Sequence, residues 1–226
     1  MREPDSTATT WASQTRLLID LAITDLEAGT GVRPSLVAFS GDDPLVLATL
    51  RPFDHGAHLD AVIEVGALVA GLGADRVAMS LSGRAWSLDD PIPPVLGPGA
   101  DLRQRVIVVH RAEASSDDDA DASVLTTIVP YDIDADDVVT TGPAFSDEGG
   151  EGPLTRALAV VVDHGRAVAA GARERGLDAE DVGRQVLRCE SLGHRLSWAA
   201  GQMAFVEHAR LLPLGDCWPG GGAATG

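Results

Sequence analysis

Two histidines and an aspartate in one short segment are the first residues of this chain whose types could do chemistry. Asp54, His55 and His58 fall where a predicted strand gives way to a predicted helix. Imidazole nitrogens and carboxylate oxygens bind divalent metals, so a metal-dependent hydrolase centred on His55 and His58 is one hypothesis. The alternative is a polar helix start, with Asp54 or His55 as the N-cap. The spacing does not match the His-Glu-x-x-His pattern of zinc proteases, so a metal would need a further ligand from elsewhere.

A second group of possible ligands lies near the C-terminus, where both cysteines of the chain fall close to two histidines. Cys189, His194, His208 and Cys217 are four ligands of the kind that a structural zinc ion prefers. Their spacing is irregular beside the short paired spacings of zinc fingers. We therefore favour a buried helical cysteine, a loop cysteine and two solvent-facing histidines.

A third group points to binding instead of catalysis. Arg84, Trp86, Asp89 and Asp90 lie at the predicted exit of a strand, before a proline-rich loop. Arginine and tryptophan are enriched at binding hot spots, so this segment is a candidate contact with a partner. The alternative is internal packing, with Trp86 at the edge of the core and Arg84 paired to Asp89 or Asp90.

The absence of lysine excludes several classes of enzyme. All seventeen basic residues are arginine, so no Schiff-base or pyridoxal lysine, no lysine of a phosphate-binding loop and no protein-kinase lysine can be present. The segment from Ser80 to Gly83 lacks the Gly-x-Ser-x-Gly pattern of hydrolases. We therefore expect no cofactor, and we favour a binding component over an enzyme.

The acidic charge of the chain is concentrated in one stretch. The net charge is −17, yet residues 114–151 carry eleven acidic residues and no basic one, whereas residues 152–226 are balanced. So much negative charge repels phosphate backbones, which argues against direct binding of nucleic acid. It also leaves open a third function, in which the acidic segment mimics nucleic acid and binds a basic protein.

The elements that must position these residues follow from hydrophobic periodicity and turn chemistry. Helical spacing predicts helices, and short apolar runs between turn residues predict strands. The turn at residues 41–44 joins two such runs into a hairpin. Strands joined by turns, without strict alternation with helices, predict an α+β fold with a mostly antiparallel sheet. The predicted helices span residues 11–27, 57–72, 154–175 and 179–192, and the predicted strands span residues 36–40, 45–51, 76–82, 105–111, 124–131 and 138–141.

The order of these elements suggests how the chain is organised. We expect an α+β domain over residues 1–145, with an acidic insert near residues 113–123, and a helical C-terminal region over residues 153–218 that packs on it. Residues 145–152 are polar enough for a linker, and residues 219–226 are expected to be a disordered tail. The pattern over residues 196–212 fits either a helix or a strand.

The N-terminus, the apolar runs and the composition of the chain predict its location and partners. The N-terminus has no basic and apolar signal, and the longest apolar runs are about half of the roughly 20 residues that a membrane helix needs, so we expect a cytoplasmic protein without membrane contact. The composition is typical of a high-GC, actinobacterial-like genome. The leading hypothesis is a non-catalytic protein that acts through contacts with a protein partner or with itself, as a homo-oligomer.

Overall fold

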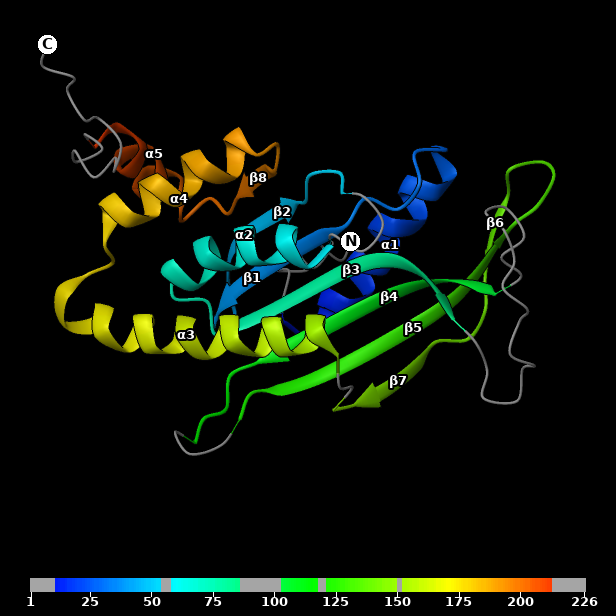
Figure 1. Ribbon diagram of the computed structural model, residues 1–226, viewed down its shortest axis with the longest axis horizontal. Coiled ribbons are helices and arrows are strands. Elements are labelled where there is room, and N and C mark those ends of the chain that lie inside the picture. Colours follow the sequence, from blue (N-terminus) through cyan, green and yellow to red (C-terminus); the bar gives the residue numbers. More distant parts are fainter. Residues whose placement is uncertain (1–10, 54–57, 86–102, 118–120, 150–151, 213–226) are drawn as a thin grey trace, which may run out of the picture.

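One antiparallel sheet organises the molecule, with helices on both of its faces (Figure 1). The computed structural model describes residues 11–53, 58–85, 103–117, 121–149 and 152–212. In chain order the elements are a 3-10 turn (Trp11–Ser13), α1 (Gln14–Glu27), β1 (Ser35–Ser40), β2 (Asp43–Thr49), α2 (His58–Gly71), β3 (Arg76–Ala85), β4 (Gln104–Glu113), β5 (Ser123–Ile133), β6 (Val139–Thr141), β7 (Phe145–Glu148), α3 (Pro153–Arg175), α4 (Ala179–Ser191), β8 (Arg195–Trp198) and α5 (Met203–Leu211).

The described strands form a single sheet in the order β6-β5-β4-β3-β1-β2-β8, and β7 pairs with the same edge of β5 as β6 does. Every pairing is antiparallel. The predicted α+β class and mostly antiparallel sheet are therefore confirmed. The predicted hairpin at residues 41–44 is also confirmed, because Ser40 pairs with Asp43 across a turn in which Gly41 has a φ of 59°.

The two faces of the sheet carry two hydrophobic clusters, as the alternation of side chains along a strand requires. On β1, Val37 and Phe39 face α1, whereas Leu36 and Ala38 face the layer formed by α2 and α3. The same alternation continues on β3, where Ala78 lies on the α1 side and Met79 on the other. This parity fixes the face on which each later residue of β3 points.

Trp11 attaches the start of the helical segment to the α1 face. Its ring meets Phe39 edge to face at 5.7 Å between centroids, and the Arg111 guanidinium lies 4.4 Å from the ring centroid. Its indole Nε1 donates a hydrogen bond to Oε2 of Glu113 at 3.0 Å. A tryptophan between an aromatic ring and a cation, with its N–H bonded, satisfies both its apolar and its polar parts.

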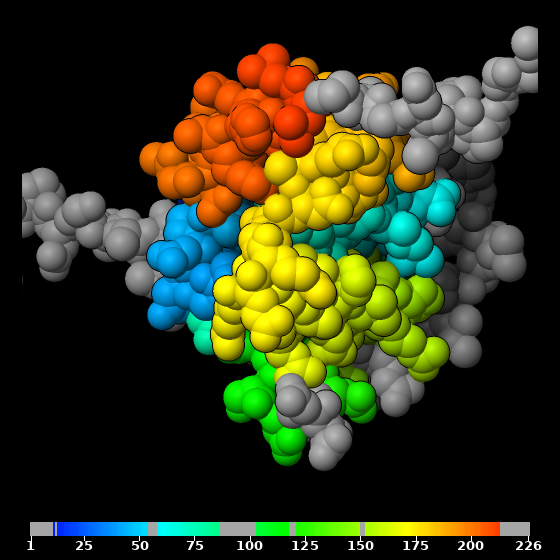
Figure 2. Space-filling view, turned by 90° about the vertical axis from the view of Figure 1, so that its left-hand side faces the viewer, coloured from blue at the N-terminus to red at the C-terminus, as the bar shows by residue number. Residues whose placement is uncertain are grey.

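The C-terminal helices pack on the face opposite α1 and form a continuous surface beside the β1–β2 hairpin (Figure 2). Asp178 caps α4 by accepting a hydrogen bond from the Asp181 N–H. Residues 196–212, for which the sequence fits either a helix or a strand, contain both, since β8 precedes α5. The predicted linker is partly wrong, because Phe145–Glu148 forms β7 along β5. In the described residues, no helix combines the length and the apolar character that crossing a membrane requires.

Candidate functional site

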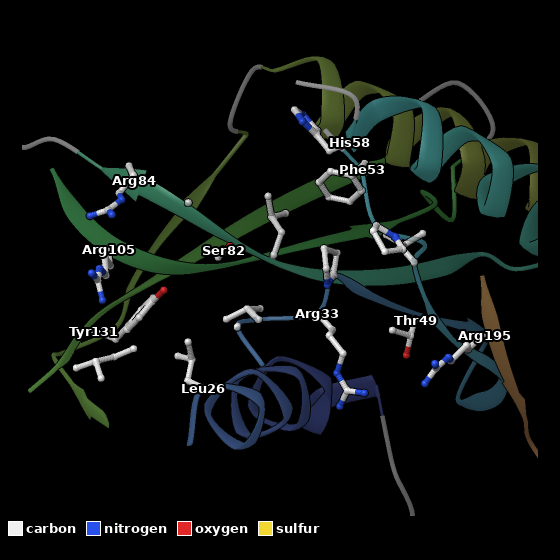
Figure 3. Close-up of a pocket in the computed structure, with 18 of the residues that line it drawn as sticks. Leu26, Arg33, Thr49, Phe53, His58, Ser82, Arg84, Arg105, Tyr131 and Arg195 are labelled. Carbon is white, nitrogen blue, oxygen red and sulfur yellow. The ribbon is translucent and has the colours of Figure 1, made fainter. Parts of the chain in front are cut away.

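A groove of about 1060 Å³ opens at the end of the sheet where β1 begins and β2 ends (Figure 3). Residues from α1, β2, α2, β3, β4, β5 and β8, with the loops beside them, contribute to its walls. The lining includes the basic side chains Arg33, Arg84, Arg103, Arg105 and Arg195, together with Leu26, Phe53, His58, Leu81, Ser82, Gly83, Tyr131 and Ile133.

The groove exists because β3 is longer than its neighbour β1. β4 pairs with β3 along its whole length, whereas β1 pairs only with Arg76–Ser80. The remaining residues, Leu81–Ala85, therefore have a paired strand on one side only in the described part of the chain. Upstream of β1 the chain turns away from this edge at Arg33 and Pro34, and the groove occupies the space that results.

An ion pair between the buried Asp25 and the exposed Arg33 holds this turn. Asp25, near the end of α1 and only 5% exposed, accepts hydrogen bonds from the backbone N–H of Arg33 at 3.0 Å and from its Nε at 2.8 Å. The guanidinium Nη2 also contacts the same carboxylate. Asp25 thus fixes the start of β1 and directs the partly exposed Arg33 side chain along one wall of the groove, as Figure 3 shows.

The groove has an unusual charge for this chain. Five arginines line it, and the described lining contains no acidic residue, although the chain as a whole carries a net charge of −17. Arg84, Arg105 and Arg195 are exposed. Among the described residues no carboxylate pairs with Arg105 or Arg195, and the Nη1 atom of Arg84 donates to the backbone carbonyl of Arg103 at 2.9 Å. Positive charge is therefore available to a ligand.

Two of these arginines stand directly opposite each other on neighbouring strands. Arg84 of β3 is in register with Arg105 of β4, and strand parity places both on the α1 face. Like charges in such cross-strand pairs are destabilising. In Figure 3 the two guanidinium groups and Tyr131 lie together at one end of the groove. A bound anion would relieve the repulsion between them.

Apolar side chains alternate with the charge along the walls. On the α1 face, Leu26 and Ile133 pack with the buried Tyr131. On the opposite face, Phe53 and Leu81 border the core beneath α2, and the His58 ring lies 6.2 Å from that of Phe53. The groove therefore suits a ligand that is both anionic and partly apolar.

The structure places only part of the predicted metal site. His58 begins α2 and lines the groove, whereas Asp54 and His55 lie outside the described residues. Across the described ranges, no group of three or more His, Cys, Asp or Glu side chains is arranged to hold a metal ion. The hydrolase hypothesis centred on His55 and His58 therefore remains a prediction.

The structure describes three of the four proposed zinc ligands, Cys189, His194 and His208. Cys189 is buried, and its thiol contacts the backbone carbonyl of Glu64 at 3.5 Å. His194 is also buried, which corrects the expectation that it faces solvent, and both of its ring nitrogens have protein partners. His208 is exposed on α5, and Cys217 lies outside the described residues.

The predicted contact segment is located only through Arg84. The sequence placed this residue beyond a strand ending near Ser82, but β3 continues to Ala85 and Arg84 lies within it. Trp86, Asp89 and Asp90 lie outside the described residues, so their role as contacts remains a prediction. Sequence reasoning missed Arg33 and Arg195, because they join the groove only through the sheet order. Comparison of the chain with protein-family models, with curated proteins and with solved structures gave no match.

Proposed function

We propose that this protein binds an acidic, partly apolar segment of a partner protein in the arginine-lined groove, and that it acts through this contact without catalysing a reaction. The observation that carries the proposal is that the exposed Arg84, Arg105 and Arg195 line one groove without a described carboxylate partner, in a chain of net charge −17. Paired guanidiniums are suited to carboxylates, which they bind through two parallel hydrogen bonds.

The size and the walls of the groove favour a polypeptide over other anions. At about 1060 Å³ the groove reaches the upper limit of typical small-molecule sites, which is roughly 1,000 Å³. Phe53 and Leu81 offer apolar contacts that a phosphate would not use. Nucleic acid is disfavoured because the acidic remainder of the chain repels its backbone.

The charge distribution would also direct the partner to the groove. An acidic partner is repelled by the exposed carboxylates near β6 and β7, such as Asp134, Asp136 and Glu148, and is attracted at the groove. Attraction at one place on a repelling surface directs the partner to that place. A partner held in this way should bind less tightly as salt screens the charges.

Titration of a defined peptide tests this proposal. The probe is a fluorescein-labelled nine-residue peptide in which Glu and Val alternate, with both ends blocked. We expect the peptide to bind the full chain. Its affinity for the Arg84→Ser/Arg105→Ser variant should be at least about ten-fold lower, since each lost charge contact is worth roughly a factor of three to ten.

A matched control separates the groove from overall charge. Arg173→Ser/Arg175→Ser removes two exposed arginines at the far end of α3 and changes the net charge by the same amount. This control should bind the peptide within about two-fold of the unaltered protein. Equal losses in the two variants, or equal binding of a peptide with Gln in place of Glu, would contradict an arginine-specific groove.

A further inference from the structure

We infer that the partner segment binds as an additional β-strand, paired with the open edge of β3 at Leu81–Ala85. This inference rests on the proposed function, because it concerns the same groove, and it specifies how the partner is recognised. The recognised segment would be extended, and its backbone would continue the sheet next to β3 in line with β1. Strand addition of this kind is an established way in which proteins bind peptides.

The backbone of β3 supplies the template. Beyond Ser80, β4 occupies one side of β3, and no described residue donates to or accepts from the backbone of Leu81–Arg84 on the other side. In a strand, alternate residues direct both N–H and C=O to the same side. Within the described residues these donors and acceptors have no partner, and they face the groove, because Leu81, Ser82, Gly83 and Arg84 line it.

The two faces of the sheet then set the sequence that such a strand should have. Ser82 and Arg84 lie on the α1 face with Arg105, whereas Leu81 lies on the opposite face near Phe53. An added strand points its side chains alternately to these two faces. Acidic residues on one face would meet the arginines, and apolar residues on the other would meet Phe53 and Leu81. The groove thus selects an alternating acidic and apolar segment.

The length of the open edge limits the segment. Leu81–Ala85 covers five positions, which is roughly 17 Å of strand at about 3.3 Å per residue. At the other end, Arg33 and Pro34 precede β1 and limit how far an added strand can run toward Ser35. A partner segment of about five or six residues would fill the edge.

The arginines also argue against pairing of this edge with a second copy of the chain. Unprotected strand edges tend to pair with each other, and charged side chains are one of the devices that prevent this. Pairing of this edge with the same edge of a second copy would bring Arg84 and Arg105 of each chain together. Such an arrangement concentrates four guanidiniums, so the occupant we infer is an acidic segment of a different protein.

Backbone methylation of the probe tests strand addition without changing its side chains. The blocked nine-residue Glu/Val peptide is made as a series, each member carrying one N-methyl group at one of the five central residues. Methylation removes one N–H donor and adds bulk only at that position. We expect losses of ten-fold or more at alternate positions and changes within about two-fold at the positions between them.

Amide exchange of the protein gives a second, independent measurement. On addition of the unmethylated peptide, the amide protons on one alternate set of residues in Leu81–Ala85 should exchange at least ten-fold more slowly, as followed by NMR of the full chain. The Arg84→Ser/Arg105→Ser variant should show no such protection at the same peptide concentration. The Arg173→Ser/Arg175→Ser control should show it unchanged.

The outcomes separate this inference from the proposed function. Arginine-dependent binding with uniform tolerance of methylation would keep the groove as the binding site and overturn strand addition. Failure of the unmethylated peptide to bind at millimolar concentration would overturn both. A concentration-dependent dimer of the full chain that the unmethylated peptide disrupts, measured by sedimentation, would assign the edge to a second copy and overturn the choice of occupant.

Discussion

His194 Nε2 donates a hydrogen bond to Oε2 of Glu64 across 2.9 Å, although the two residues are 130 positions apart in the chain. The Nδ1 atom of the same ring accepts the backbone N–H of Arg51, so its proton lies on Nε2. The Arg51 guanidinium pairs with both oxygens of Glu64, at 2.8 and 2.9 Å. This junction joins the turn before β8 to α2 and to the end of β2, and it lies next to the groove residues Arg195 and Phe53.

Replacing Glu64 with Gln should weaken this junction. Gln can still accept a hydrogen bond from His194, but it leaves the Arg51 guanidinium without its carboxylate. The free energy of unfolding should fall by about 1–3 kcal/mol, which is the cost of leaving such a group unpaired. Chemical denaturation measures this loss. Glu180→Gln is the control, because the pair of Glu180 with Arg184 is exposed and contributes at most about 0.5 kcal/mol.

The same carboxylate makes stability depend on acid pH. The Arg51 guanidinium, with the His194 hydrogen bond, lowers the pKa of Glu64 to about 2 from an ordinary value of 4.5. The unfolded chain therefore takes up this proton at a higher pH than the folded one does. The contribution is complete above pH 4.5 and is lost as the pH falls toward 2. Glu64→Gln should flatten the stability profile in that interval, and an unchanged profile would contradict this assignment.

A second acid-sensitive group, His110, lies on β4, on the face of the sheet that α2 and α3 cover. Burial, and to a smaller extent the nearby charge of His58, lowers the pKa of His110 below 6.5, while its Nδ1 lies 2.9 Å from the Thr126 hydroxyl. The unfolded chain binds the proton first, so the free energy of unfolding should fall as the pH drops below 6.5. His110→Gln should reduce this fall in denaturant titrations at pH 7.5, 6.5 and 5.5. His164→Gln, at an exposed position of α3, should leave it unchanged.

The sequence was sufficient to predict those helices and strands that depend on a local pattern. Periodicity located α1, α2, α3 and α4 to within a few residues, and the turn at residues 41–44 predicted the β1–β2 hairpin. The end of β3 was missed because residues 83–85 form a strand only through pairing with β4. β7 was missed for a related reason, since its polar sequence, Phe-Ser-Asp-Glu, becomes a strand only beside β5.

The groove could not be predicted from the sequence, because its arginines lie far apart in the chain. Arg33, Arg84, Arg105 and Arg195 meet only through the sheet order β4-β3-β1-β2-β8, which no local pattern specifies. The sequence did single out Arg84, on composition alone. Arg105 becomes part of the groove only through the register, which places it opposite Arg84.

The thiol of Cys189 should be unreactive in the folded protein. Burial, together with the nearby Glu64 carboxylate, raises the pKa of this thiol to about 11, so almost no thiolate forms at pH 8. In a Cys217→Ser background, modification by a disulfide reagent should be at least about a hundred-fold slower for the native protein than for the protein in denaturant. Rapid labelling under native conditions would show that α4 separates readily from α2.

A close contact of α3 gives a sharp test of packing. A Cβ at Gly165 would lie 1.8 Å from the backbone carbonyl oxygen of Ala74, which cannot move without shifting the turn before β3. Gly165→Ala should cost about 3 kcal/mol and lower the melting temperature by about 5–10 °C. Gly171→Ala on the same helix would contact only the flexible end of Arg175, so it should be neutral or stabilising by up to about 1 kcal/mol. Equal effects of the two would contradict this packing.

The last prediction concerns the cost of keeping two arginines opposite each other. Arg105→Glu turns the cross-strand pair with Arg84 from repulsive to attractive, so it should raise the free energy of unfolding by about 0.5–1 kcal/mol at low salt. Arg105→Gln removes the repulsion alone and should give a smaller gain, and 1 M salt should reduce both gains. Both variants should bind the Glu/Val peptide more weakly. If Arg105→Glu instead lowered stability in low salt, the two guanidiniums would not be an uncompensated pair. A gain in stability accompanied by a loss of binding would mean that the positive charge of the groove serves binding, because this charge lowers the stability of the fold.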